Sequence, residues 1–219
     1  MERVNASLTG RFERPLLHWL CKKMPAWVTS DRLTALGVAG AAMAFAGYVL
    51  SHRSPAFLWL ACLGIALNWL GDSLDGSLAR YRARERPRYG FFLDHMTDTL
   101  AMALIALGIG CSPYGAMTSA MAVLLGYYVM VILTMVTSKT TGVFAISFAG
   151  VGPTEIRLFI IGCSIAAFVW PTPRFAWQGM NFTLYDAIMV GLTALLVATC
   201  AVQAIGTARM LARQDPPRG

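Results

Sequence analysis

The sequence contains few charged residues. Asp, Glu, Lys and Arg make up 13% of its 219 residues, whereas 57% of the residues are hydrophobic. About a quarter of the residues in a typical soluble domain are charged. The composition therefore predicts a membrane protein rather than a soluble domain. The net charge of +7 would suit a nucleic-acid-binding protein, but the large hydrophobic fraction argues against nucleic acid as a partner.

The sequence also lacks the cysteine spacing of a zinc site or a disulfide framework. Its five cysteines are scattered, and no two form a C-x-x-C pair, so we interpret them as small apolar packing residues. It has no repeat and no low-complexity tract. The first 31 residues contain charges and two prolines but no apolar stretch of suitable length, so we expect no cleavable signal peptide.

Long apolar runs are what the sequence does contain. A helix that crosses a bilayer needs about 20 largely apolar residues. The predicted spans are residues 33–50, 56–79, 90–111, 114–137, 156–171 and 184–207. The expected fold class is therefore an all-α integral membrane protein with about six transmembrane helices. We expect one domain over residues 1–219: an interfacial segment at 1–31, a transmembrane bundle at 32–208 and a cytoplasmic tail at 209–219.

The segment before the first predicted span, RFERPLLHWLCKKMPAWV, is too short to cross a bilayer. We predict an interfacial amphipathic helix that ends near Pro25, with its basic residues toward water and anionic headgroups. Its apolar residues would face lipid: Leu16, Leu17, Trp19 and Leu20. A soluble N-terminal cap is the alternative. The apolar, glycine-rich segment 140–153 is predicted to be a loop that dips into the interface.

Basic residues predict the orientation in the membrane. With both termini on one side, that side holds 16 of the 18 Lys and Arg residues, and only Arg53 and Arg174 lie on the other. Because basic residues concentrate on the cytoplasmic side, we expect both termini and the loop after the second span to be cytoplasmic. The expected location is a bacterial inner membrane, crossed several times. Most arginines of the second loop would then simply mark the cytoplasmic face.

One stretch breaks the apolar pattern. GDSLDGSLARYRARERPRYGFFLDHMTD, residues 71–98, contains four aspartates at the ends of two predicted spans. Asp72 and Asp75 are three residues apart, Asp94 and Asp98 four, so each pair shares a helix face. The short connection makes the two helices antiparallel neighbours, and their carboxylates can converge. A charge deep in the bilayer costs at least about 2.5 kcal/mol, so these acids need cationic compensation.

Three interpretations of these acids are open from the residues alone. They could pair with arginines of the second loop, although only Arg80 lies on the helix one turn from the acids. They could form the ion pathway of a cation transporter, although no later span carries a matching acid. They could bind Mg²⁺ or Mn²⁺ together with a phosphate-bearing substrate. Small residues at Gly76, Ala79 and Gly90 leave room for such a ligand, or serve helix packing.

The full pattern resembles the signature of the CDP-alcohol phosphotransferase family. In this sequence it reads Asp72-x-x-Asp75-Gly76-x-x-Ala79-Arg80, then Gly90-x-x-x-Asp94-x-x-x-Asp98. Eight fixed residues within 27 positions make the resemblance specific. Nine residues separate Arg80 from Gly90, one more than is usual in the family. The extra residue belongs to the loop and leaves the spacing within each helix intact.

The resemblance implies a six-span fold, commonly homodimeric, whose active site is open to the cytoplasm and to lipid. The implied ligands of Mg²⁺ or Mn²⁺ are Asp72, Asp75, Asp94 and Asp98. The implied nucleotide-binding residues are Gly76, Ala79, Arg80 and Gly90. Asp98 is also the implied general base. The implied partners are a CDP-linked substrate and a lipid, either diacylglycerol or CDP-diacylglycerol.

Two shorter features resemble the choline/ethanolamine phosphotransferase branch. His95 directly follows Asp94, and GPTEIRLFII, residues 152–161, resembles a Thr-Glu-containing start of a later span. In that branch a His and this Glu, here His95 and Glu155, are proposed to activate the hydroxyl of diacylglycerol. From the residues alone two interpretations are open: His95 and Glu155 act as a base and its orienting partner, or His95 is a packing residue and Glu155 caps a helix. Lys139 and Arg157 either bind a phosphate or are ordinary cytoplasmic-side residues.

The sequence therefore predicts a phospholipid-synthesising transferase. The preferred reaction transfers a phospho-alcohol from a CDP-alcohol of the choline or ethanolamine type to diacylglycerol and releases CMP. The alternative uses CDP-diacylglycerol as the donor of a phosphatidyl group to inositol, serine or a glycerol phosphate. A cation transporter is the non-enzyme alternative.

Overall fold

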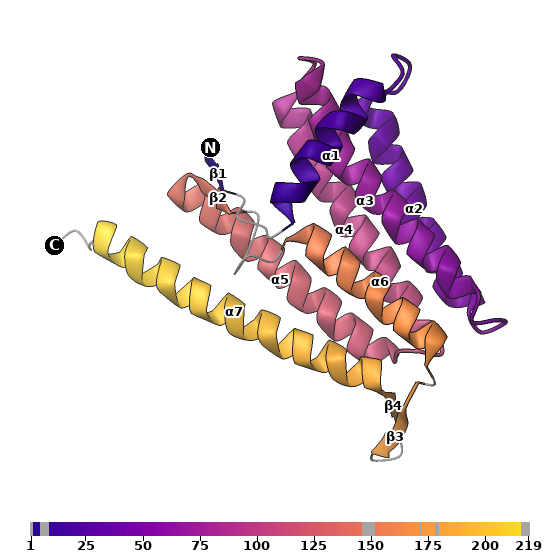
Figure 1. Cartoon of the computed structure of the whole chain (residues 1–219). Helices are drawn as coiled ribbons and strands as arrows, with labels where there is room; N and C mark the ends of the chain where they lie inside the picture. The colour runs from indigo at the N-terminus through magenta and orange to yellow at the C-terminus, as the bar shows by residue number, and fades with distance from the viewer. Residues whose placement is uncertain (1, 5–8, 146–151, 171, 178–179, 216–219) are drawn as a thin grey trace.

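The computed structural model describes residues 2–4, 9–145, 152–170, 172–177 and 180–215, and these form helices and two short two-stranded sheets (Figure 1). The helices are α1 (Gly10–Lys23), α2 (Ser30–Leu50), α3 (Phe57–Tyr81), α4 (Pro87–Gly110), α5 (Met117–Thr141), α6 (Pro153–Val169) and α7 (Leu184–Gln214). The strands are β1 (Glu2–Val4), β2 (Val143–Ala145), β3 (Arg174–Trp177) and β4 (Met180–Thr183).

Close packing of α2 against α3 forms the centre of the bundle. A Cβ added at Gly64 of α3 would lie 2.6 Å from the carbonyl oxygen of Gly40 in α2. Glycine lets the two backbones approach, as small residues do in membrane helix pairs. The core beside this contact contains Tyr48, Ile65 and Ile105, each at most 3% exposed.

The other helices surround this pair. α4 packs on α2, α6 on α3, and α5 on both α4 and α7. Figure 1 shows α7 lying along α5, away from α2 and α3. The hydroxyls of Tyr48 in α2 and Ser164 in α6 are hydrogen-bonded at 2.7 Å, which satisfies both polar groups inside the bundle. β3 and β4 pair in antiparallel fashion between α6 and α7.

The outward-facing surface of the bundle is apolar. Val202 and Leu195 of α7 and Leu125 and Ile132 of α5 are each more than 60% exposed. Five helices, α2, α3, α4, α5 and α7, are long and apolar enough to cross a membrane. The all-α membrane fold class is thus confirmed. All six predicted spans coincide with helices, but α6 has only 17 residues, so the count of six spans stays a prediction.

α1 matches the helix predicted ahead of the bundle, but one assigned side chain points the other way. Trp19 is 51% exposed, and the Lys23 ammonium lies 4.4 Å from its ring centroid. Leu17, expected to face lipid, is instead 9% exposed and packs in a core cluster with Cys21 and Leu74 of α3. α1 therefore has two apolar sides. One packs on α3, and the other is exposed on the surface.

The predicted interfacial loop at 140–153 falls partly outside the described residues, since 146–151 are not among them. At its start, Gly142 ends α5 with a φ of +77°, a left-handed conformation that glycine adopts without steric cost. β2 then pairs in parallel with β1. The placement of this segment at the membrane interface stays a prediction.

Candidate metal and nucleotide site

The connection between α3 and α4 is fixed by arginines of the second loop. The Arg82 guanidinium donates to the carbonyl oxygens of Met24, at 3.0 Å, and Pro25, at 2.8 Å, and also to that of Val28. Arg86 forms an ion pair with Asp31 at the start of α2. These arginines tie the α3–α4 connection to the segment around the start of α2, which goes beyond the predicted role of marking the cytoplasmic face.

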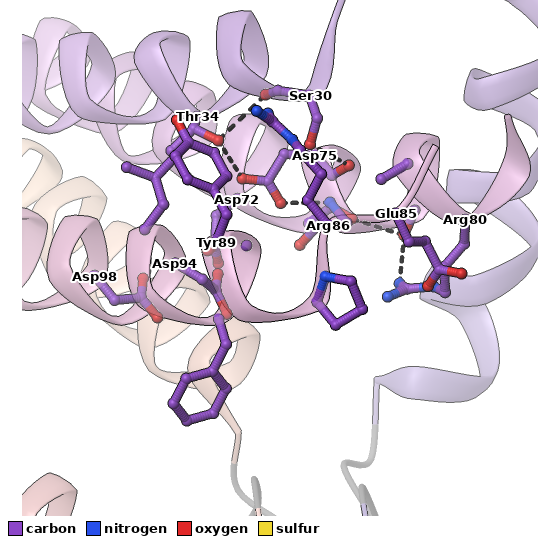
Figure 2. Close-up of a pocket in the computed structure, with 18 of the residues that line it drawn as sticks. Ser30, Thr34, Asp72, Asp75, Arg80, Glu85, Arg86, Tyr89, Asp94 and Asp98 are labelled. Atoms are coloured by element: carbon purple, nitrogen blue, oxygen red, sulfur yellow. Dashed lines mark hydrogen bonds between the residues drawn. The ribbon is translucent and has the colours of Figure 1, made fainter. Parts of the chain in front are cut away.

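Three of the four aspartates converge. One carboxylate oxygen from each of Asp72, Asp94 and Asp98 lies within 4.8 Å of the others, and all three side chains are half-buried. Figure 2 shows Asp94 and Asp98 on one helix, α4, beside the α3 aspartates. Clustered carboxylate oxygens are the donor set that Mg²⁺ and Mn²⁺ prefer, so these residues fit a hard divalent cation.

Asp75 lies in the same cavity but is bound differently. Its Oδ2 accepts a hydrogen bond of 2.6 Å from the Thr34 hydroxyl, and its Oδ1 accepts one from the backbone N–H of Gly76. The Ser30 hydroxyl donates to its backbone carbonyl at 2.8 Å. The beginning of α2 thus holds Asp75 beside the three converging carboxylates (Figure 2). Its assignment as a metal ligand stays a prediction.

The cation that compensates the acids comes from α6. Arg157 is 1% exposed, and its guanidinium pairs with Asp72 at 2.7 Å and with Asp98 at 2.9 Å. Its Nε donates to Asn68 Oδ1 at 2.9 Å. The acids are therefore paired with an arginine, as one of the three interpretations held. That arginine belongs to α6, however, and not to the second loop.

All eight signature residues line one cavity of about 1270 Å³. Gly90 faces open space, with no heavy atom within 4 Å of an added Cβ. A Cβ at Gly76 would lie 3.3 Å from the Arg80 guanidinium, so the small residue lets this side chain lie close to α3. The extra loop residue between Arg80 and Gly90 does not separate the two halves of the signature.

The cavity wall includes residues that the sequence did not indicate. Glu13 of α1 lines it, and its Oε1 accepts hydrogen bonds from Trp69 Nε1 at 3.2 Å and from the Ser73 hydroxyl at 2.9 Å. Thr34 of α2 also lines it. So does Lys139 of α5, which the sequence had already offered as a candidate phosphate-binding residue. Glu13 is the single acidic residue in a basic amphipathic segment. This departure from the charge of its neighbours could have identified Glu13 as a site residue from the sequence.

His95 and Glu155 lie apart from that wall. Among the described residues neither lines the cavity. The Nδ1 of His95 donates a hydrogen bond to the Phe91 carbonyl oxygen at 2.7 Å and lies 4.0 Å from an Asp94 oxygen. Glu155 accepts hydrogen bonds from the N–H and hydroxyl of Thr9, both at 2.9 Å, and from the N–H of Gly152. Glu155 therefore caps α6 and joins it to the start of α1.

Comparisons with known proteins agree on one family. The model of the CDP-alcohol phosphatidyltransferase family matches residues 24–198. The chain is 29% identical over 178 residues to CDP-diacylglycerol–serine O-phosphatidyltransferase of Encephalitozoon cuniculi, covering 74% of this chain and 44% of that protein. It is 28% identical over 115 residues to cholinephosphotransferase 1 of Rattus norvegicus, covering 48% and 29%. The chain thus spans less than half the length of these relatives.

A solved structure has the same fold. Phosphatidylinositol phosphate synthase of Mycobacterium tuberculosis, with CDP-DAG bound, superposes with a TM-score of 0.62 at 18% sequence identity. The match covers 90% of this chain and 94% of that one.

Proposed function

Because the chain belongs to the CDP-alcohol phosphatidyltransferase family, we propose that it is a membrane enzyme of phospholipid biosynthesis that transfers a phosphate-linked group from a CDP-activated donor to a hydroxyl. One observation carries the proposal: all eight signature residues line one cavity, in which three carboxylates are close enough to share a cation. Family membership also favours a transferase over the cation transporter that the sequence had left open.

In the proposed reaction each side chain has a distinct task. Asp72, Asp94 and Asp98, with Asp75 beside them, would hold Mg²⁺ or Mn²⁺, which would neutralise the diphosphate when bound. Arg80 would bind a phosphate of the donor. The acceptor hydroxyl oxygen forms a bond to phosphorus, its proton passes to Asp98, and the bond from phosphorus to the CMP oxygen breaks. Holding the acceptor and the donor in one cavity makes this displacement effectively unimolecular.

For the donor, we propose a CDP-alcohol of the choline or ethanolamine type, with diacylglycerol as acceptor. The support is the Asp94–His95 pair, the Thr154–Glu155 pair and the similarity to a cholinephosphotransferase over 115 residues. His95 and Glu155 would then help to activate the acceptor hydroxyl, whose proton passes to Asp98. Because they lie outside the cavity wall, this role requires them to approach it once substrate is bound.

Two observations favour CDP-diacylglycerol as the donor instead. Glu155 is held by Thr9 and Gly152 in a helix cap, where it does not contact the cavity. Lys139 lines the cavity near Ser138, and an ammonium group there would attract an anionic acceptor such as glycerol phosphate and repel choline. This second candidate uses the same acids and the same leaving group.

A substrate panel distinguishes the two reactions. Purified protein with Mn²⁺ would be given two sets of substrates, and release of CMP would be measured in each. The first set is CDP-choline or CDP-ethanolamine with diacylglycerol. The second set is CDP-diacylglycerol with serine, inositol or a glycerol phosphate. We expect CMP only in the first set, because the donor's alcohol is transferred to diacylglycerol. CMP only in the second set would reverse the assignment of donor and acceptor. No CMP in either set would contradict the proposed reaction itself.

We further propose that both termini and the cavity face the cytoplasm of a bacterial cell, and that the chain forms a homodimer as family resemblance implies. The orientation rests on the 16 basic residues at one side.

Cys111 offers a test of this orientation, because it is exposed at the end of α4 opposite the acids. Burial raises the pKa of the Cys21 thiol, which slows its reaction with maleimides.

A membrane-impermeant maleimide is therefore expected to label Cys111 in intact spheroplasts. The control is Cys111→Ser combined with Arg84→Cys, which places the exposed thiol in the second loop. It should be labelled only after the membrane is permeabilised. The reverse labelling pattern would place the cavity on the outer side.

A further inference from the structure

Arg157 is the most deeply buried cation that the structure describes, and it lies against the acids. Its side chain is 2% exposed, while those of Asp72 and Asp98 are 21% and 25% exposed. A buried arginine is costly unless its donors are satisfied by charged or polar partners. Here three nitrogens have them: Nε donates to Asn68, and the two terminal nitrogens donate to Asp72 and Asp98.

The three hydrogen bonds of the Arg157 guanidinium, called the fork below, join three helices at one point. Arg157 belongs to α6, Asn68 and Asp72 to α3, and Asp98 to α4. Each carboxylate uses one named oxygen for the guanidinium, Oδ2 of Asp72 and Oδ1 of Asp98. A carboxylate has two oxygens, so each can bind a cation through the other. Rotation of either carboxylate about its side-chain bonds would break a charge-assisted hydrogen bond, so the pairing fixes the direction in which the second oxygen points.

The charges in this cluster support the same conclusion. Asp72, Asp94 and Asp98 carry three negative charges when ionised, and Arg157 carries one positive charge. Arg157 therefore reduces the repulsion among the carboxylates without saturating the cluster.

We propose that Arg157 is a positioning residue for the metal site, holding Asp72 and Asp98 in the orientation that binds a divalent cation. This inference rests on the proposed function, since it assumes that the three carboxylates bind Mg²⁺ or Mn²⁺. Hydrogen-bond partners of metal ligands typically change metal affinity by about 10- to 100-fold. The planar guanidinium is essential to this role, because an ammonium group cannot match three partners in one plane.

Arg157→Lys separates geometry from charge. It keeps the positive charge but loses the fork, so we expect Mn²⁺ affinity to fall about tenfold. Binding would be measured by titrating the purified, metal-free full chain with Mn²⁺ and following free Mn²⁺ by electron paramagnetic resonance. The apparent KM for Mn²⁺ in CMP release should rise by the same factor while kcat at saturating Mn²⁺ changes little, a split that a purely structural role would not produce.

The matched control is Arg53→Lys, the same substitution at an exposed position outside the cavity. It should leave Mn²⁺ affinity unchanged. If Arg157→Lys does not fold, Asn68→Ala provides a second test, because it removes the Nε partner but keeps both carboxylate pairs. It should weaken Mn²⁺ binding in the same direction but less. If Arg157→Lys folds and binds Mn²⁺ with wild-type affinity, the positioning role is wrong. If Arg157→Lys does not fold, wild-type Mn²⁺ affinity in Asn68→Ala overturns the positioning role instead. Absence of Mn²⁺ binding by the wild type would instead contradict the metal site on which it rests.

Discussion

Asp94→Asn and Asp98→Asn are each expected to abolish CMP release. Asparagine keeps the shape of the side chain but removes the negative charge that would bind a divalent cation. At Asp98 it also removes the proposed proton acceptor, and general-base catalysis typically contributes about 10²- to 10⁴-fold to a rate. The rate of CMP release by purified protein, at saturating donor and Mn²⁺, would be compared with that of the wild type.

The matched control is Asp215→Asn, because Asp215 is exposed at the end of α7 and does not line the cavity. It should keep wild-type activity. A chelator should inactivate the wild type, and excess Mn²⁺ should restore it. Full activity in both Asp94→Asn and Asp98→Asn would contradict the metal-dependent mechanism, whichever molecule is the donor.

Much of the fold could be predicted because its cause lies in local composition. Each predicted span coincides with a helix, since an apolar run of this length is stable in a bilayer only when its backbone bonds are satisfied internally. The orientation of α1 was harder to predict. Leu17 and Trp19 are equally apolar in sequence, and only the presence of α3 beside α1 determines that Leu17 is buried.

The site was predictable where a pattern repeats along one helix. The spacings of Asp72, Asp94 and Asp98 placed them on converging faces, and the three carboxylates do converge. Asp75 lies three residues from Asp72 and was expected to converge as well, yet it is held by a hydrogen bond from Thr34, a residue 41 positions away. Arg157 lies 85 positions from Asp72. In sequence it resembles any basic residue at the end of a predicted span, so its pairing could only be read from the assembled bundle.

The α2–α3 contact was missed for a related reason. A glycine within an apolar run reads as one more small residue, and its neighbour on the other helix is not visible in sequence. Gly40 and Gly64 are 24 positions apart, yet their backbones are in direct contact across the helix pair. The contact lies within the helix that carries Asp72, so the approach of α2 to α3 also determines how Thr34 reaches Asp75.

Gly64→Ala should therefore destabilise the whole bundle. The added methyl group would lie 2.6 Å from the Gly40 carbonyl oxygen and against the backbone nitrogen of Ala44. Backbone atoms cannot move aside as a flexible side chain can, so the helices must separate. Overpacking usually costs about 1–3 kcal/mol, and contact with backbone places this site at or above the upper end. Thermal unfolding of the detergent-purified protein should show a clearly lower midpoint and a loss of monodisperse protein.

Gly162→Ala in α6 is the matched control, because no heavy atom lies within 4 Å of its added Cβ. Alanine is favoured over glycine in a helix by about 1 kcal/mol, so this variant should be as stable as the wild type or slightly more so. The same substitution in two helices then gives opposite results, and the difference measures the close approach of α2 to α3. Equal midpoints for Gly64→Ala and Gly162→Ala would mean that the two helices can separate without cost. In that case the close glycine contact could not be what holds Thr34 against Asp75.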